Sequence, residues 1–119
     1  MTNLIQRITE AIIRQEGEPL TALNPGNLRF APWLTNPKIV NGFWVPDSRK
    51  EGIAGVAHCV ALHIAEGHSL AFMIGDPVRG WAPKADHNNT IAYIKNIKTW
   101  AEIPDENAPL WNYIEDGTL

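Results

Sequence analysis

The feature that most constrains this fold is a long break in helical periodicity between two helix-forming segments. Residues 19–45 carry prolines and glycines too closely spaced for a helix to run between them, at Pro25, Gly26, Pro32, Pro37 and Gly42. The segments on either side repeat apolar residues at the spacing of helices. The sequence therefore predicts a helix, an irregular excursion and a second helix, within a mainly α fold.

The first helix is predicted over residues 4–16. Apolar residues recur along one face, at Leu4, Ile5, Ile8, Ala11 and Ile12. Gly17 accepts the left-handed geometry that follows a last helical turn, and Pro19 cannot continue a helix. The helix is therefore expected to end at Glu16.

The remaining elements are one hairpin and several helices. Asn41-Gly42, between β-branched and aromatic residues, predicts a type I′ turn in a hairpin over residues 39–45. Helices are expected over residues 52–66, after Ser69, after Thr90 and after Pro109. Gly52 and Gly55 indicate close approach of a neighbouring backbone to the central helix.

Size and charge exclude several classes of protein. The chain has 119 residues and a mass of 13.2 kDa, which suits one domain and one core. The formal net charge of −3 gives no general attraction to nucleic acid or anionic lipid. No apolar run approaches the ~20 residues that span a bilayer, and no signal peptide is evident. We expect a protein made in the cytoplasm with neither nucleic acid nor membrane as partner.

Glu16 is the first candidate for chemistry. It lies four residues after Ile12 and eight after Ile8, so it continues the apolar face of the first helix. Burial and the negative end of the helix dipole both disfavour an ionised carboxylate there, and a general acid needs the protonated form. The alternative is a solvated side chain at a frayed helix end.

A polar turn follows this helix. Asn24-Pro25-Gly26-Asn27-Leu28-Arg29 carries amides that both donate and accept hydrogen bonds, which suits a cleft for sugar hydroxyls and acetamido groups. The alternative is an ordinary Pro-Gly turn with Asn caps.

The order of these motifs resembles the phage and prophage muramidases of the lysozyme-like superfamily, which are related to soluble lytic transglycosylases. The resemblance covers roughly residues 10–95. It rests on the following strings: Gln15-Glu16-Gly17, Asn24 to Arg29, Gly42-Phe43, Met73-Ile74, Trp81-Ala82-Pro83 and Asn88 to Tyr93. It implies a single lysozyme-like domain over residues 1–119, of α+β type, with a short hairpin after the first helix.

The resemblance also implies an activity and a site. The enzyme would cut the β-1,4 bond between N-acetylmuramic acid and N-acetylglucosamine in bacterial peptidoglycan, with Glu16 as the acid. One wall of the cleft would carry Asn24, Asn27 and Arg29. The opposite wall would carry Trp81, Asn88, Asn89 and Tyr93. Without a signal peptide, such an enzyme would reach the cell wall after holin release, through secretion or as part of a virion.

The sequence departs from the family pattern in three places. Glu18 stands where an aromatic residue is usual, Asn89 where an acid is usual and Val45 where phenylalanine is expected. The candidates for a second carboxylate are Glu18 and Asp47, and neither lies in a strong motif. One-carboxylate chemistry is therefore favoured, with either a hydrolysed or an anhydro product.

Other chemistries find little support. The four histidines have no metal-ligand spacing, and Cys59 has no partner for a disulfide, so we expect no metal and no cofactor. Two further hypotheses stay open. One is a catalytically silent virion or baseplate component that binds glycan or other virion proteins, and the other is a helical protein-binding module.

Overall fold

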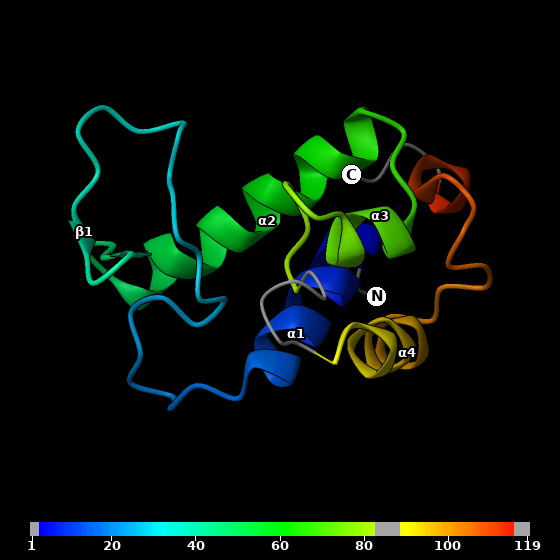
Figure 1. Ribbon diagram of the computed structural model, residues 1–119, viewed down its shortest axis with the longest axis horizontal. Helices are drawn as coiled ribbons and strands as arrows, with labels where there is room; N and C mark the ends of the chain where they lie inside the picture. The colour runs from blue at the N-terminus through cyan, green and yellow to red at the C-terminus, as the bar shows by residue number, and fades with distance from the viewer. Residues whose placement is uncertain (1–2, 83–88, 116–119) are drawn as a thin grey trace.

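Helices dominate the parts of the chain that the computed structural model describes, residues 3–82 and 89–115. The elements in chain order are α1 (Leu4–Glu16), β1 (Ile39–Val40), β2 (Phe43–Trp44), α2 (Arg49–Ala65), α3 (Leu70–Gly75), α4 (Thr90–Trp100) and the 3-10 turn η2 (Leu110–Tyr113) (Figure 1). A mainly α fold with a short hairpin after the first helix is confirmed. Within the described ranges, no helix is both long and apolar enough to cross a membrane.

α1 begins and ends where its sequence predicts. Asn3 accepts a hydrogen bond from the backbone N–H of Gln6, whose side chain in turn caps the N–H of Asn3. Gly17 follows the last turn with φ of 66°, the left-handed conformation expected there. On the face of α1 that packs against the core, Ile8 and Ile12 are completely buried. The register of α1 thus fixes where its last residue, Glu16, lies.

α2 starts three residues earlier than its apolar period indicates. Ser48 accepts a hydrogen bond from the backbone N–H of Glu51 and so caps a first turn that is wholly polar. Arg49, in that turn, donates to the carbonyl oxygens of Pro19 and Ala22 at 3.3 and 2.8 Å. The prediction of a start at residue 52 was wrong because capping, and not apolar spacing, decides this end.

The hairpin has the predicted turn. β1 and β2 pair antiparallel, with Val40 opposite Phe43, across the two-residue loop Asn41-Gly42. Both loop residues have positive φ, 52° and 80°, as a type I′ turn requires. Each strand is only two residues long.

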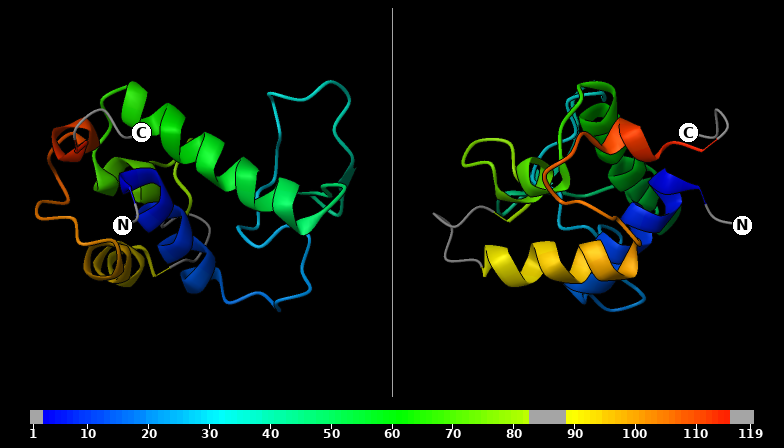
Figure 2. Two further views of the ribbon diagram at one scale, coloured as in Figure 1. Left: turned by 180° about the vertical axis from the view of Figure 1, so that it is seen from behind. Right: turned by 90° about the vertical axis from the view of Figure 1, so that its right-hand side faces the viewer.

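α2 joins two parts of the molecule. Figures 1 and 2 show α1, α3 and α4 together on one side, and the hairpin with its flanking loops on the other. α1 packs against both α4 and α2, and α3 packs against α4. Trp44, at the hairpin end of α2, is 2% exposed and lies against Gly55. The active-site candidates lie where these two parts meet.

Close backbone approach to α2 is confirmed at Gly52. A Cβ atom there would collide with the backbone carbonyl oxygen of Leu23. This contact brings the segment that precedes the Asn24–Arg29 turn against the first turns of α2. Glycine at residue 52 therefore helps to set the position of that turn relative to Glu16.

Candidate active site

Both carboxylate oxygens of Glu16 are held by hydrogen bonds. Oε1 accepts from Asn27 Nδ2 at 3.0 Å, and Oε2 accepts from the Tyr93 hydroxyl at 2.8 Å. Glu16 is the last residue of α1, and its side chain is partly buried. Three residues far apart in the sequence thus meet at one carboxylate, whose orientation is fixed from two sides.

Asn27 comes from the polar turn and bridges two acids. Its Nδ2 donates to Glu16 and also to Glu18 Oε1, at 2.8 Å. Its φ of 51° is left-handed, a conformation that asparagine tolerates better than most residues. The amide therefore places a second, exposed carboxylate beside Glu16.

Asn24 holds the same turn in shape. Its Nδ2 donates to the carbonyl oxygens of Leu28 and Trp44, at 2.8 and 2.9 Å, and its Oδ1 accepts from the N–H of Leu28. These bonds tie the turn to β2. All three go to the main chain, and a contact between Asn24 and a substrate stays a prediction.

Tyr93 reaches Glu16 from α4 and is only 6% exposed. Burial, then the charge of Glu16 and its hydrogen bond, raise the pKa of the Tyr93 phenol well above its usual range. The phenol therefore stays protonated at any physiological pH. It acts as a permanent hydrogen-bond donor to Glu16.

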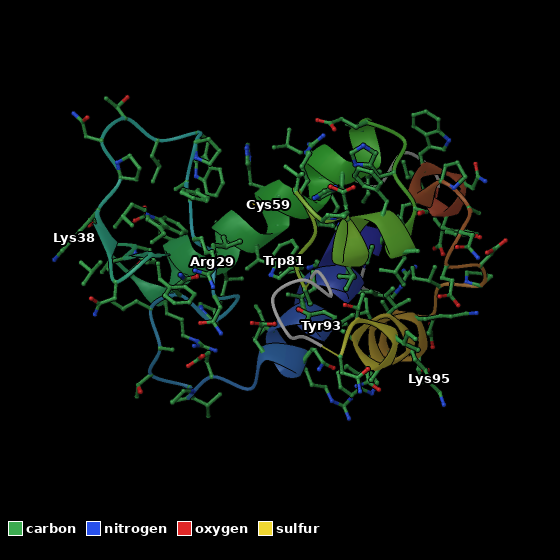
Figure 3. All side chains as sticks on the ribbon, viewed as in Figure 1. Arg29, Lys38, Cys59, Trp81, Tyr93 and Lys95 are labelled. Atoms are coloured by element: carbon green, nitrogen blue, oxygen red, sulfur yellow. The ribbon has the colours of Figure 1, made fainter. Side chains whose placement is uncertain are left out.

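Asn27 also lines a cavity of about 380 Å³, whose walls include neither Glu16 nor Tyr93. Its walls come from residues 27–32, from α2 and from the segment 77–81. Arg29 lies on one wall, with its guanidinium 4.7 Å from the centre of the Phe43 ring. Trp81 also lines the cavity, and its indole N–H donates to the Gly26 carbonyl at 3.0 Å. Figure 3 shows Arg29, Trp81 and Cys59 gathered in the middle of the molecule.

One histidine of a contacting pair lines this cavity. His63 lines it from α2, and its Nδ1 is 2.9 Å from His68 Nδ1. Burial, together with the positive charges of His68 and Arg79, lowers the pKa of His63 to about 4. His63 is therefore neutral near pH 7. Burial likewise raises the pKa of Cys59 to about 11, which leaves an unreactive thiol.

The remaining predicted site residues are less central. Asn89 is exposed and caps α4, accepting from the N–H of Ala92 at 3.1 Å. Asn88 lies outside the described residues. Over residues 3–82 and 89–115, no group of three or more His, Cys, Asp or Glu side chains is arranged to hold a metal ion.

Sequence reasoning missed several residues that line the cavity. Val78, Arg79 and Gly80 follow the helix break at Asp76-Pro77 without any recognisable pattern. Cys59 and His63, by contrast, could have been grouped from the sequence. They are four residues apart on α2, and residues at this spacing lie on the same face of a helix.

Comparison with protein-family models, with curated proteins and with solved structures finds no match for this chain.

Proposed function

We propose that the protein is a lysozyme-like muramidase that cleaves the β-1,4 bond between N-acetylmuramic acid and N-acetylglucosamine in peptidoglycan. The observation that carries the proposal is the carboxyl of Glu16, oriented by Asn27 and Tyr93, together with a cavity that Asn27 itself lines. A general acid must be held at a fixed place next to a bound substrate. The order of helix, hairpin and helix, with the acid ending the first helix, accords with this family.

In the proposed reaction, protonated Glu16 gives its proton to the glycosidic oxygen as the bond from that oxygen to C1 breaks. The sugar passes through an oxocarbenium-like state. The Glu16 carboxylate then takes a proton either from water or from the 6-hydroxyl of the muramic acid. The oxygen that loses this proton bonds to C1, and Glu16 is protonated again.

A second catalytic carboxylate is not part of the proposal. The Oε1 atoms of Glu16 and Glu18 bind the same Asn27 nitrogen, so the two acids lie side by side. A nucleophile or base would have to face the sugar from the side opposite the acid. Glu18 is therefore not arranged like the partner in a two-carboxylate enzyme. Asp47 is exposed in the segment before α2, where its backbone N–H binds Glu51.

The test is the release of muropeptides from purified peptidoglycan by wild-type protein and by Glu16→Gln. Removal of a general acid should lower the rate by about 10²- to 10⁴-fold. Glu10→Gln, an exposed change on the same helix, is the matched control and should keep full activity. Loss of turbidity and mass spectrometry of the fragments report the rate and the product, because anhydro products are one water lighter.

Two outcomes would contradict the proposal. One is wild-type protein that leaves peptidoglycan uncut across pH and ionic strength. The other is Glu16→Gln that cuts as fast as wild type. Glycan binding without any cleavage would favour the catalytically silent component instead.

A further inference from the structure

We infer that the cavity beside Asn27 binds the carboxylate-bearing peptide stem of the muramic acid whose bond is cleaved. This inference rests on the proposed function and names the part of the substrate that the cavity takes. Asn27 both contacts Glu16 and lines the cavity, so the cavity begins one side chain away from the acid. The peptide stem is attached to the very sugar at the scissile bond, and it must therefore lie close to Glu16.

The charges around the cavity favour an anionic occupant. Arg29 and Arg79 line the cavity from separate segments, and no Asp or Glu of the described chain is among the lining residues. This contrasts with the formal net charge of −3 for the whole chain. N-acetylglucosamine is neutral, whereas the peptide stem carries free carboxylates. A neighbouring sugar would leave both arginines without an anionic partner in the substrate.

Arg79 keeps donors for a ligand despite its ion pair. Its Nη1 is 2.7 Å from Glu66 Oε2, while a guanidinium has five N–H donors. Both side chains of this pair are substantially exposed, at 47% and 42%, and such surface pairs hold their geometry weakly. The guanidinium can therefore bind a substrate carboxylate either with the Glu66 ion pair in place or after that pair has separated.

Apolar side chains also line the cavity. Phe30 and Val78 line the cavity from separate segments and are 71% and 90% exposed, which is unusual for large apolar side chains. Leu62 of α2 contributes a further apolar surface. Alanyl methyl groups and the lactyl methyl of a peptide stem match such walls, and its carboxylates match the arginines. The volume of about 380 Å³ lies in the range of small-molecule sites.

The test compares three forms of one soluble glycan strand. The first carries intact peptide stems, the second carries stems whose carboxylates are converted to methylamides, and the third has no stems. We expect wild-type protein to cut the intact strand with a kcat/KM about tenfold or more above the other two. Arg29→Gln with Arg79→Gln should lower the ratio of kcat/KM on the intact strand to kcat/KM on the other two strands to about one.

Lys38→Gln and Lys95→Gln are the matched controls. Both lysines are exposed, and they point outwards at the ends of the molecule in Figure 3. Each control removes one positive charge and should retain the preference for intact strands. Thermal unfolding of all variants checks that the exposed substitutions leave the fold intact.

The outcomes separate the two proposals. Equal cleavage of all three strands by wild-type protein would overturn the peptide-stem inference and leave the muramidase proposal standing. An equal drop on all three strands in the double arginine variant would overturn it as well. Cleavage of none of the strands by wild-type protein would overturn the proposed function and the inference together.

Discussion

One amide nitrogen, Asn27 Nδ2, holds the two acids at the end of α1 in place. Asn27→Asp keeps the size of the side chain and tolerates the left-handed backbone, but it replaces the shared donor by a third carboxylate. We expect the free energy of unfolding at pH 7 to fall by about 1–3 kcal/mol. Urea unfolding measures this loss.

A double-mutant cycle checks that the loss comes from the bridge. When Asn27→Asp is combined with Glu18→Gln, the new amide at residue 18 can donate to the new carboxylate at residue 27, and part of the stability should return. Strictly additive losses would show that the Asn27–Glu18 hydrogen bond contributes nothing. Glu18→Gln alone should leave cleavage within about threefold of wild type, because Glu18 has no proposed catalytic role.

The Tyr93 hydroxyl positions Glu16 and is expected to matter for both stability and rate. Tyr93→Phe removes a hydrogen bond to a carboxylate, which should lower the free energy of unfolding by about 1–2 kcal/mol. Loss of orientation at Glu16 should lower kcat by about tenfold to a hundredfold. Tyr113→Phe is the matched control, because that hydroxyl makes only a long 3.5 Å contact with the carbonyl of Asp105. Unchanged kcat in Tyr93→Phe would contradict the positioning role.

His63 should make the fold sensitive to acid. Its pKa is about 4 in the folded protein, against about 6.5 in an unfolded chain. At pH values between these two pKa values, His63 binds a proton when the protein unfolds. The free energy of unfolding therefore falls as pH decreases from about 6.5 to about 4. The groups that face it are His68, Arg79, Glu66 and Asp76.

The loss attributable to His63 should approach about 3 kcal/mol by pH 4. His63→Gln replaces the imidazole with a group that does not titrate, and its unfolding free energy should vary less with pH over this range. Urea unfolding at half-unit pH steps provides the comparison. Parallel pH curves for the two proteins would contradict the assignment.

Among the elements, α2 controls where the Asn24–Arg29 turn lies. In Gly52→Ala the added Cβ would collide with the Leu23 carbonyl oxygen. The collision can be relieved only if the backbone before the Asn24–Arg29 turn moves. We expect a loss of about 1–3 kcal/mol in unfolding free energy, together with slower cleavage. The adjacent, exposed Ile53→Ala should change stability by less than about 0.5 kcal/mol. Activity unchanged in Gly52→Ala would show that the turn does not depend on this contact.

Local capping signals predicted the helix ends well where they coincide with apolar periodicity. Gly17 ends α1, and Ser69 caps α3 through the N–H of Phe72. The start of α2 was missed because Ser48 is followed by a polar first turn, in which no apolar spacing marks a helix.

The site was predictable only in part, for a physical reason. Helical register alone points Glu16 toward the core, but its partner Tyr93 is 77 residues away, and only tertiary packing brings them together. The family resemblance proposed Asn27 and Tyr93 as cleft residues, not their bonds to Glu16. Arg79 gave no signal, because an irregular segment has no period from which its direction follows.

Taken as a whole, the molecule combines a negative net charge with a cationic cavity. If carboxylates of the substrate meet Arg29 and Arg79, added salt should weaken that attraction. We expect kcat/KM on intact strands to fall several-fold between about 0.02 and 0.3 M NaCl, with little change on strands whose carboxylates are methylamides. Initial rates on both strands measure this effect, and equal salt dependence would contradict it.

The 17-residue helix α2 also has a mechanical consequence. Its first turns contact Leu23 and Trp44, while it also packs against α1 and η2. The Trp81 indole N–H also connects the two sides, because it donates a hydrogen bond to the Gly26 carbonyl. The two sides are thus joined both by α2 and by this hydrogen bond, so a change in the distance between them would require α2 to bend or the hydrogen bond to break. If the protein is the proposed muramidase, its glycan strand would therefore bind in an opening whose width changes little.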